Sequence, residues 1–147
     1  MPSKTVLFLC TGNYYRSRFA EELFNHRAER DGLIWRAESR ALAIERGKHN
    51  VGPISRLVLQ ALQARGCVPR GIARMPQPCT AADLENADLV IALKDSEHRP
   101  LMLERFPEWE GRTEFWFVDD IDVTPPDQAL AAIEREVERL LQRLSKE

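Results

Sequence analysis

The stretch that most constrains the fold of this chain is residues 4–22, where an apolar run meets a short polar loop and then an amphipathic pattern. Residues 6–9 are continuously apolar, as in a strand that is buried on both faces. Gly12 and Asn13 follow, and these residue types adopt positive φ angles most easily. From Ser17, a good N-cap residue, apolar residues recur with helical spacing at Phe19, Ala20, Leu23, Phe24 and Ala28. The stretch therefore predicts a strand, a tight loop and a helix whose N-terminus faces the loop.

Cys10 and Arg16 enclose this loop, with five residues between them. A loop at a helix N-terminus can turn its backbone N–H groups inward and bind a tetrahedral oxyanion. Arg16 adds a planar cation that binds two oxygens at once, and this field favours a thiolate over a thiol at Cys10. A thiolate below a bound phosphate is placed for in-line attack on phosphorus. The predicted phosphate-binding residues are Thr11, Gly12, Asn13, Tyr14, Tyr15, Arg16 and Ser17. The simpler alternative is a small core cysteine followed by an unrelated arginine.

Residues 10–17, CTGNYYRS, with Ala20 and Glu21 just beyond, resemble the signature loop of the low-molecular-weight protein tyrosine phosphatases and of the arsenate reductases that share their fold. In that family a second cysteine usually precedes the arginine, where this chain has Tyr15, and a proline usually follows the serine, where it has Arg18. The first departure removes the local disulfide partner of the nucleophile. The second departure, Arg18 in place of proline, is expected to cost the helix start little, because the helix has its own cap.

Composition places the chain among ordinary single-domain proteins. A chain of 147 residues with 44% hydrophobic residues can form one domain, residues 1–147, with its own core. Its formal net charge of −2 gives no reason to expect nucleic acid or a membrane surface as a partner. The N-terminal apolar run is too short for a signal peptide or a membrane span, so we expect a cytoplasmic protein. Cys10, Cys67 and Cys79 are odd in number and widely spaced, which argues against a disulfide framework or a zinc site, and we expect no metal or other cofactor.

The remaining pattern alternates strands with helices. Strands are predicted at residues 33–39, 87–93 and 112–117, and helices from Pro53 to the break at Gly66, from a capping box at Thr80 and Asp83, and at 97–106 and 128–144. This order predicts an α/β three-layer sandwich, in which a four-stranded parallel sheet carries helices on both faces. The resemblance, which spans nearly the whole chain, implies the strand order 2-1-3-4. Ligands bind at the carboxyl ends of such strands, where Cys10 lies.

Three further residues are candidates for supporting the loop or lining its pocket. The resemblance implies that Ser39, at the end of the second strand, supports the loop by hydrogen bonding, although a serine that simply ends a strand is an equal alternative. His49 and Asn50 resemble a family segment that forms one wall of the pocket. A solvent-exposed loop histidine is the alternative for His49.

The end of the third strand departs from the family. Lys94 stands where the family commonly has an acidic residue, and Asp95 comes one position later. Either Asp95 or Ser96 is predicted to cap the next helix, and either can reach the loop network. His98 is interpreted as a residue of the helix surface.

A general acid is expected in the acidic loop at residues 118–126. The resemblance to the family's Asp-Pro loop, in which a tryptophan often lies four residues before the acid, selects Asp120 from its spacing to Trp116. Asp119 stays an alternative, because Ile121 replaces the proline, and a solvated acidic loop is the simpler interpretation. With Asp120 as acid and then base, the predicted protein is a phosphomonoester hydrolase that acts through a cysteinyl-phosphate intermediate.

Two other functions use the same loop. Arsenate reduction requires further thiols, but Tyr15 replaces the nearby one and Cys79 has no partner a few residues downstream. A non-catalytic oxyanion-binding module would keep the loop and lose catalysis, as the departures at Tyr15, Lys94 and Ile121 suggest.

The partner in the leading hypothesis is a phosphorylated substrate, either a phosphotyrosyl protein or a small phosphomonoester. Residues 121–123 replace a pair of tyrosines that walls the pocket in the family, which should weaken ring binding by roughly tenfold unless Tyr14 or His49 compensates. We therefore expect hydrolysis of small aryl phosphates with weak discrimination for phosphotyrosyl peptides. Acidic peptides should be disfavoured by Asp119, Asp120 and Asp122.

Overall fold

The computed structural model describes residues 3–120 and 123–146, in which β-strands alternate with helices. The strands are β1 (Lys4–Cys10), β2 (Trp35–Ala41), β3 (Leu89–Ala92) and β4 (Glu114–Phe115). The α-helices are α1 (Arg16–Arg30), α2 (Arg56–Ala64), α3 (Ala81–Asn86), α4 (Asp95–Arg105) and α5 (Pro126–Leu144), and the 3₁₀ helices are η1 (Ile44–Gly47) and η2 (Pro107–Arg112). In the part of the chain so described, no helix has both the length and the apolar character to cross a bilayer.

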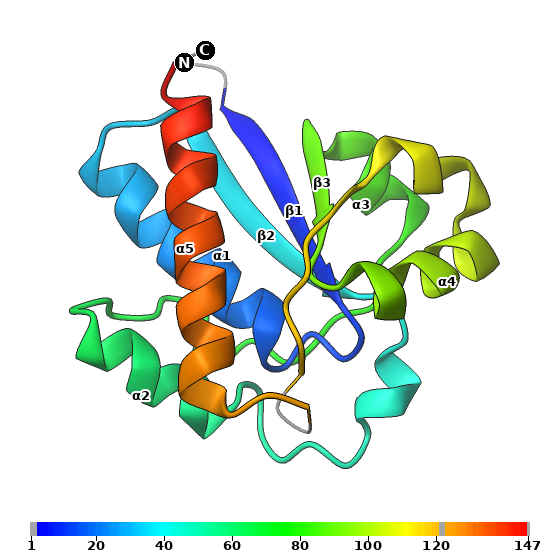
Figure 1. Cartoon of the computed structure of the whole chain (residues 1–147), viewed down its shortest axis with the longest axis horizontal. Coiled ribbons are helices and arrows are strands. Elements are labelled where there is room, and N and C mark those ends of the chain that lie inside the picture. The colour runs from blue at the N-terminus through cyan, green and yellow to red at the C-terminus, as the bar shows by residue number, and fades with distance from the viewer. Residues whose placement is uncertain (1–2, 121–122, 147) are drawn as a thin grey trace.

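The four strands form one parallel sheet in the order β2-β1-β3-β4, which confirms the predicted topology. Strand β1 is internal and pairs with β2 over its whole length, from Lys4 opposite Trp35 to Cys10 opposite Ala41. The chain therefore leaves β1 at an internal position of the carboxyl edge, where a parallel sheet offers its ligand-binding crevice (Figure 1).

Alternating side chains of β1 build two cores. Val6 and Phe8 belong to the core that is covered by α1, α2 and α5, whereas Leu7 and Leu9 belong to the core beneath α3, α4 and η2. Figure 1 shows these helices on opposite faces of the sheet. The predicted three-layer arrangement is confirmed, and it holds the end of β1 rigidly because all four side chains are buried.

Two strand predictions need correction. Strand β2 covers residues 35–41 rather than 33–39, so Ser39 lies within the strand and not at its end. Strand β4 has only two residues instead of the predicted 112–117, because residues 107–112 form η2 and residue 116 leaves the ladder.

Helix starts were partly predicted. The capping box of Thr80 and Asp83 is present at α3. Helix α2 begins at Arg56 instead of Pro53, because the Ser55 hydroxyl accepts a hydrogen bond at the helix start. Helix α4 begins at Asp95 and has no side-chain cap, so the prediction that Asp95 or Ser96 caps it is wrong.

Candidate functional site

A cavity of about 280 Å³ opens at the carboxyl end of β1. Its lining residues come from the loop before α1, from the segment before α2 and from the connection that leads to α5: Cys10, Thr11, Gly12, Tyr14, Tyr15, Arg16, Asn50, Ser55 and Asp120. The sequence predicts all of these except Ser55, whose residue type carries no distinctive signal in a loop.

The candidate nucleophile is Cys10, which is 3% exposed. Its Sγ lies 2.9 Å from Ser17 Oγ, and Ser17 Oγ accepts a hydrogen bond from Asn13 Nδ2 at 2.9 Å. This leaves the hydroxyl hydrogen of Ser17 to point at the sulfur, an arrangement that suits a thiolate. The prediction that Ser17 caps α1 is wrong, because Ser17 lies inside the first turn and Tyr15 occupies the N-cap position.

Asn13 holds the loop in shape. Its φ of 53° is the left-handed conformation that the sequence predicts at this point. Asn13 Nδ2 also donates to Ser39 Oγ at 2.8 Å, and Asn13 Oδ1 accepts from Arg74 Nη1 at 3.2 Å. Ser39 Oγ donates in turn to Glu21 Oε1 at 2.5 Å. The structure thus places Ser39 below the loop, fully buried, where the sequence expects a supporting group.

Arg16 is 2% exposed and is held by the groups around it. It donates from Nη1 to the carbonyl of Val118 at 3.0 Å and from Nη2 to Glu97 Oε2 at 2.6 Å. Asp120 Oδ2 lies 3.5 Å from the same Nη2. Burial alone would lower the pKa of Arg16, but the charges of Cys10 and Glu97 raise it above its ordinary value. A permanent cation therefore lines the cavity.

Glu97 and His98 reach the loop from the first turn of α4. Thr11 Oγ1 donates to Glu97 Oε2, and His98 Nε2 lies 3.3 Å from that oxygen. Burial of Glu97 opposes its ionisation, yet the hydrogen bonds from His98 and Arg16 hold its pKa well below the usual range. Burial lowers the pKa of His98, so its ring is neutral at pH 7. Because His98 Nδ1 accepts from the backbone N–H of Lys94 at 2.9 Å, the ring hydrogen is assigned to Nε2.

The interpretation of His98 as a surface residue is therefore wrong, since the ring is fully buried. Ser96 is exposed and makes no hydrogen bond to the loop within the described residues, and Asp95 pairs with Arg99 at 2.8 Å. Sequence reasoning also missed Glu97. Its one signal is an acidic side chain in the first turn of a helix that begins at the carboxyl edge of the sheet.

The neighbouring carboxylates Asp119 and Asp120 have different surroundings. Asp120 lines the cavity, whereas Asp119 Oδ1 forms an ion pair with Lys94 Nζ at 2.5 Å. Asp119 Oδ2 accepts a hydrogen bond from Thr124 Oγ1 at 2.9 Å. The hydrogen bonds from Lys94 and Thr124 lower the pKa of Asp119. Ile121 and Asp122, to which the sequence assigns part of the pocket wall, lie outside the described residues.

The opposite wall comes from the segment that precedes α2. Asn50 lines the cavity, as predicted, whereas His49 is exposed and is not among the lining residues. Tyr14 Oη donates to the carbonyl of Val51 at 2.6 Å, and the backbone N–H of Ser55 donates to the carbonyl of Tyr14 at 3.1 Å. Tyr14 is thus tied to this wall and lines the cavity.

The departure at Arg18 is expected from the sequence to cost little because α1 has its own cap, but no side chain in the described part of the chain caps α1. Arg18 itself has no exposed surface. Its Nη1 donates to the carbonyls of Pro53 and Arg74, both at 2.9 Å, and its Nη2 donates to the carbonyl of Gly71 at 2.6 Å. Arg18 therefore fastens two loops to the start of α1. These partners lie 35 to 56 residues away in the sequence, so no local pattern indicates them.

Tyr15 is 7% exposed, and its hydroxyl is buried without a hydrogen-bond partner in the described structure. Burial, reinforced by the negative charge of Asp120, raises the pKa of Tyr15 to about 12. The phenol therefore stays protonated at neutral pH.

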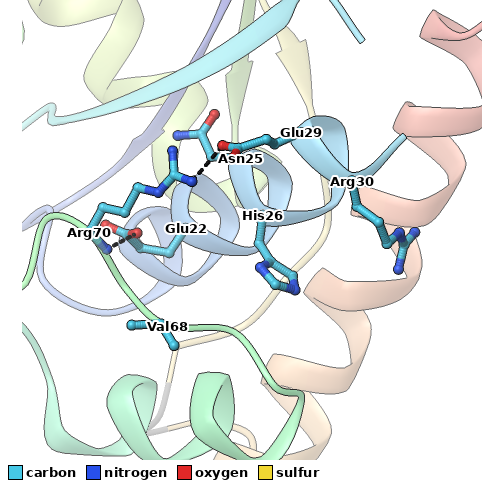
Figure 2. A pocket seen from close by; sticks show the side chains of 7 residues that line it. All are labelled: Glu22, Asn25, His26, Glu29, Arg30, Val68 and Arg70. Carbon is cyan, nitrogen blue, oxygen red and sulfur yellow. Dashed lines mark hydrogen bonds and ion pairs between the residues drawn. The ribbon is translucent and has the colours of Figure 1, made fainter. Parts of the chain in front are cut away.

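A second hollow, of about 450 Å³, lies over α1. Figure 2 shows its lining side chains, in which Arg70 pairs with Glu29 at 2.6 Å and the Arg70 backbone N–H donates to Glu22 at 2.9 Å. Its other lining residues are Asn25, His26, Arg30 and Val68. This hollow has no cysteine or serine nucleophile in its lining, so the chemistry belongs to the cavity at Cys10.

Comparison with known proteins agrees with this site. The family model described as low molecular weight phosphotyrosine protein phosphatase matches residues 5–147. One relative, the protein-arginine-phosphatase of Bacillus subtilis (strain 168), is 28% identical over 107 residues, which cover 73% of this chain and 66% of that protein. The chain thus aligns with slightly less than two thirds of that relative's length.

Solved structures share the fold over the whole chain. The low molecular weight protein tyrosine phosphatase from T. tengcongensis superposes with a TM-score of 0.76 at 26% identity, covering 98% of this chain and 99% of that one. YfkJ from Bacillus subtilis superposes with a TM-score of 0.84 at 22% identity, covering 99% of this chain and 97% of YfkJ. The likeness to YfkJ concerns the fold alone.

Proposed function

The chain belongs to the low molecular weight phosphotyrosine protein phosphatase family, and we propose that it hydrolyses phosphomonoesters through a cysteinyl-phosphate intermediate. The observation that carries this proposal is the pairing of Cys10 Sγ with Ser17 Oγ at 2.9 Å inside the cavity that Arg16 and Asp120 also line. A nucleophile, a fixed cation and a carboxyl group then surround one phosphate-sized space.

In the first step the Cys10 thiolate attacks phosphorus, and the bond from phosphorus to the ester oxygen breaks. Protonated Asp120 gives its proton to the departing alcohol or phenol. Arg16 and the backbone N–H groups of the loop stabilise the charge on the equatorial oxygens.

In the second step water attacks the phosphocysteine, and Asp120 takes a proton from that water. The bond between phosphorus and Sγ breaks, which releases inorganic phosphate and regenerates the thiolate of Cys10. The Ser17 hydroxyl supports this step, because it can donate a hydrogen bond to the leaving sulfur.

The substrate class rests on the shape of the cavity. Tyr14 and Tyr15 give it aromatic walls, and the volume of about 280 Å³ suits a single phosphorylated ring or side chain. We propose small aryl phosphates as substrates, with weak discrimination for phosphotyrosyl peptides. A working thiolate at Cys10 also favours a reducing compartment such as the cytoplasm.

The arsenate alternative requires a second thiol to accept the sulfur-bound intermediate. Burial raises the pKa of Cys67 and raises that of Cys79 to about 12, which makes both thiols poor nucleophiles. Steady thioredoxin-linked or glutathione-linked turnover of arsenate would favour this alternative over a phosphatase.

The test is turnover of p-nitrophenyl phosphate and phenyl phosphate by purified variants. Cys10→Ser and Arg16→Lys should each abolish turnover, whereas Cys79→Ser, a matched control at another buried thiol, should retain it. Asp120→Asn should slow phenyl phosphate more than p-nitrophenyl phosphate, because the poorer leaving group needs the proton more.

Full activity in Cys10→Ser would refute the mechanism. If inorganic phosphate binds to the wild-type protein but no aryl or alkyl phosphate is turned over at any pH, the chain is an oxyanion-binding module instead.

A further inference from the structure

The connection between β4 and α5 presents two adjacent carboxylates, only one of which lines the cavity. Asp120 lies 3.5 Å from Arg16 Nη2. That contact cannot last through the reaction, because a phosphate dianion bound at Arg16 competes with Asp120 for the same guanidinium. Contacts that do not involve Arg16 therefore matter for the placement of Asp120 once the substrate is bound.

Asp119 supplies such contacts on the other side of the chain. One of its oxygens pairs with Lys94 Nζ at 2.5 Å, and the other accepts from Thr124 Oγ1 at 2.9 Å. Asp119 thereby joins the end of β3 to the far side of the turn that carries Asp120.

Lys94 is anchored on rigid structure. It lies at the N-cap position of α4, and its backbone N–H donates to the buried His98 ring at 2.9 Å. Lys94 also forms an antiparallel bridge with Phe117, two residues before Asp119. The backbone of Lys94 is therefore fixed, and its side chain reaches the acidic turn from that fixed position.

The turn itself is closed by its own backbone. The carbonyl of Asp120 accepts hydrogen bonds from the N–H groups of Val123 and Thr124, at 3.0 and 3.1 Å. The residue after Asp120 is isoleucine, so no proline ring restricts the backbone there. The side-chain contacts of Asp119 thus reach across a turn that these backbone bonds also close.

We propose that Lys94, Asp119 and Thr124 form a clamp that positions Asp120 as the general acid. The clamp residues do not touch the substrate, and they act only through the placement of Asp120. This proposal rests on the phosphatase function proposed above, and it assigns a task to Lys94, which departs from the family pattern.

The test compares Lys94→Met, Asp119→Asn and the double variant on two substrates. With phenyl phosphate, kcat/KM, which reports only the steps through release of the leaving group, should fall by about tenfold, a fraction of the 10² to 10⁴ that a general acid contributes. With p-nitrophenyl phosphate, whose leaving group needs little protonation, kcat/KM should change by less than about twofold. The inhibition constant of inorganic phosphate should stay constant, because Arg16 and the loop bind it.

The double variant should lose as much activity with phenyl phosphate as each single variant, since removing either partner already breaks the ion pair between Lys94 and Asp119. Lys94→Arg should restore most of the activity. Arg139→Met, which removes an ion pair with Glu136 on the surface of α5, is the matched control and should leave both substrates unaffected.

A second readout does not depend on turnover. Amide hydrogen exchange at Val123 and Thr124 should be faster in Lys94→Met than in the wild-type protein. Unchanged exchange, equal losses of kcat/KM on both substrates, or additive losses of kcat/KM in the double variant would each overturn the clamp. Weaker phosphate inhibition in Lys94→Met would overturn it too, because the lysine would then act on the phosphate directly.

The Cys10→Ser variant distinguishes failure of the phosphatase mechanism from failure of the clamp. If Cys10→Ser retains full turnover, the cysteinyl-phosphate mechanism is refuted whatever the clamp variants do. If Cys10→Ser is inactive and the clamp variants depend on the leaving group no more than the wild-type protein does, the mechanism stands and the clamp is wrong.

Discussion

Arg18→Met is expected to lower the free energy of unfolding by about 3–5 kcal/mol. The guanidinium has no exposed surface and makes three hydrogen bonds to backbone carbonyls, at 2.6 to 2.9 Å. Hydrogen bonds that involve a charged group contribute about 1.5–3 kcal/mol each, and part of that is offset because methionine avoids the desolvation of a buried cation. Arg18 Nε, which has no hydrogen-bond partner in the described structure, adds to this desolvation.

Equilibrium unfolding in urea, followed by the fluorescence of the three buried tryptophans, measures the change. With a slope of about 1–3 kcal/mol per molar urea, the midpoint should fall by about 2 M. Arg18→Lys should recover only a minor part, because one ammonium cannot reach three carbonyls in the fork geometry of arginine. Arg139→Met, at a side chain that is 70% exposed, should stay within about 0.5 kcal/mol of the wild-type protein. A loss below about 1 kcal/mol in Arg18→Met would refute the assigned role.

Three further predictions concern Tyr15, Glu97 and the three cysteines. Tyr15→Phe should raise the free energy of unfolding by about 1 kcal/mol in the same urea assay, because it removes a buried hydroxyl that lacks a partner; a decrease would reveal an unseen partner. Glu97 has a folded-state pKa below its ordinary value of 4.5, so its stabilisation is complete above pH 4.5 and is lost as the pH falls below it. Glu97→Gln should therefore flatten the acid decline of stability, and an equally steep decline would contradict this. Burial raises the pKa of Cys67 and Cys79, so iodoacetamide at pH 7 should alkylate Cys10 and neither of these two thiols. Peptide mapping identifies the alkylated cysteine, and alkylation of Cys79 in the folded protein would disprove this prediction.

The parts of the site that depend on neighbouring residues could be predicted from the sequence. Cys10, Asn13 and Arg16 lie within one strand–loop–helix unit, so the apolar run, the left-handed position and the helix start identify them together. Asp120 could be selected only with the help of a family spacing, because an acidic loop by itself is a common surface feature.

Long-range contacts explain what could not be predicted. Glu97 and Arg16 are 81 residues apart, and their contact depends on how α4 begins at the sheet edge. The burial of His98 follows from the same placement and not from any local pattern. Ser17 illustrates a different failure, because its type favours an N-cap while its hydroxyl is committed to Cys10 and Asn13.

The carbonyl contacts of Arg18 also bear on how this protein can change over evolution. The backbone acceptors at Pro53, Gly71 and Arg74 are present whatever side chain a position carries, so Arg18 recognises the path of two loops and not their amino acids. Substitutions in the irregular residues 67–79 that preserve this path leave the anchor intact, except at Gly71, where a Cβ would lie 2.9 Å from Glu22 Oε2. Loops beside the catalytic cavity can therefore diverge in sequence, and with them the surface that meets a substrate, while a single arginine keeps them in place.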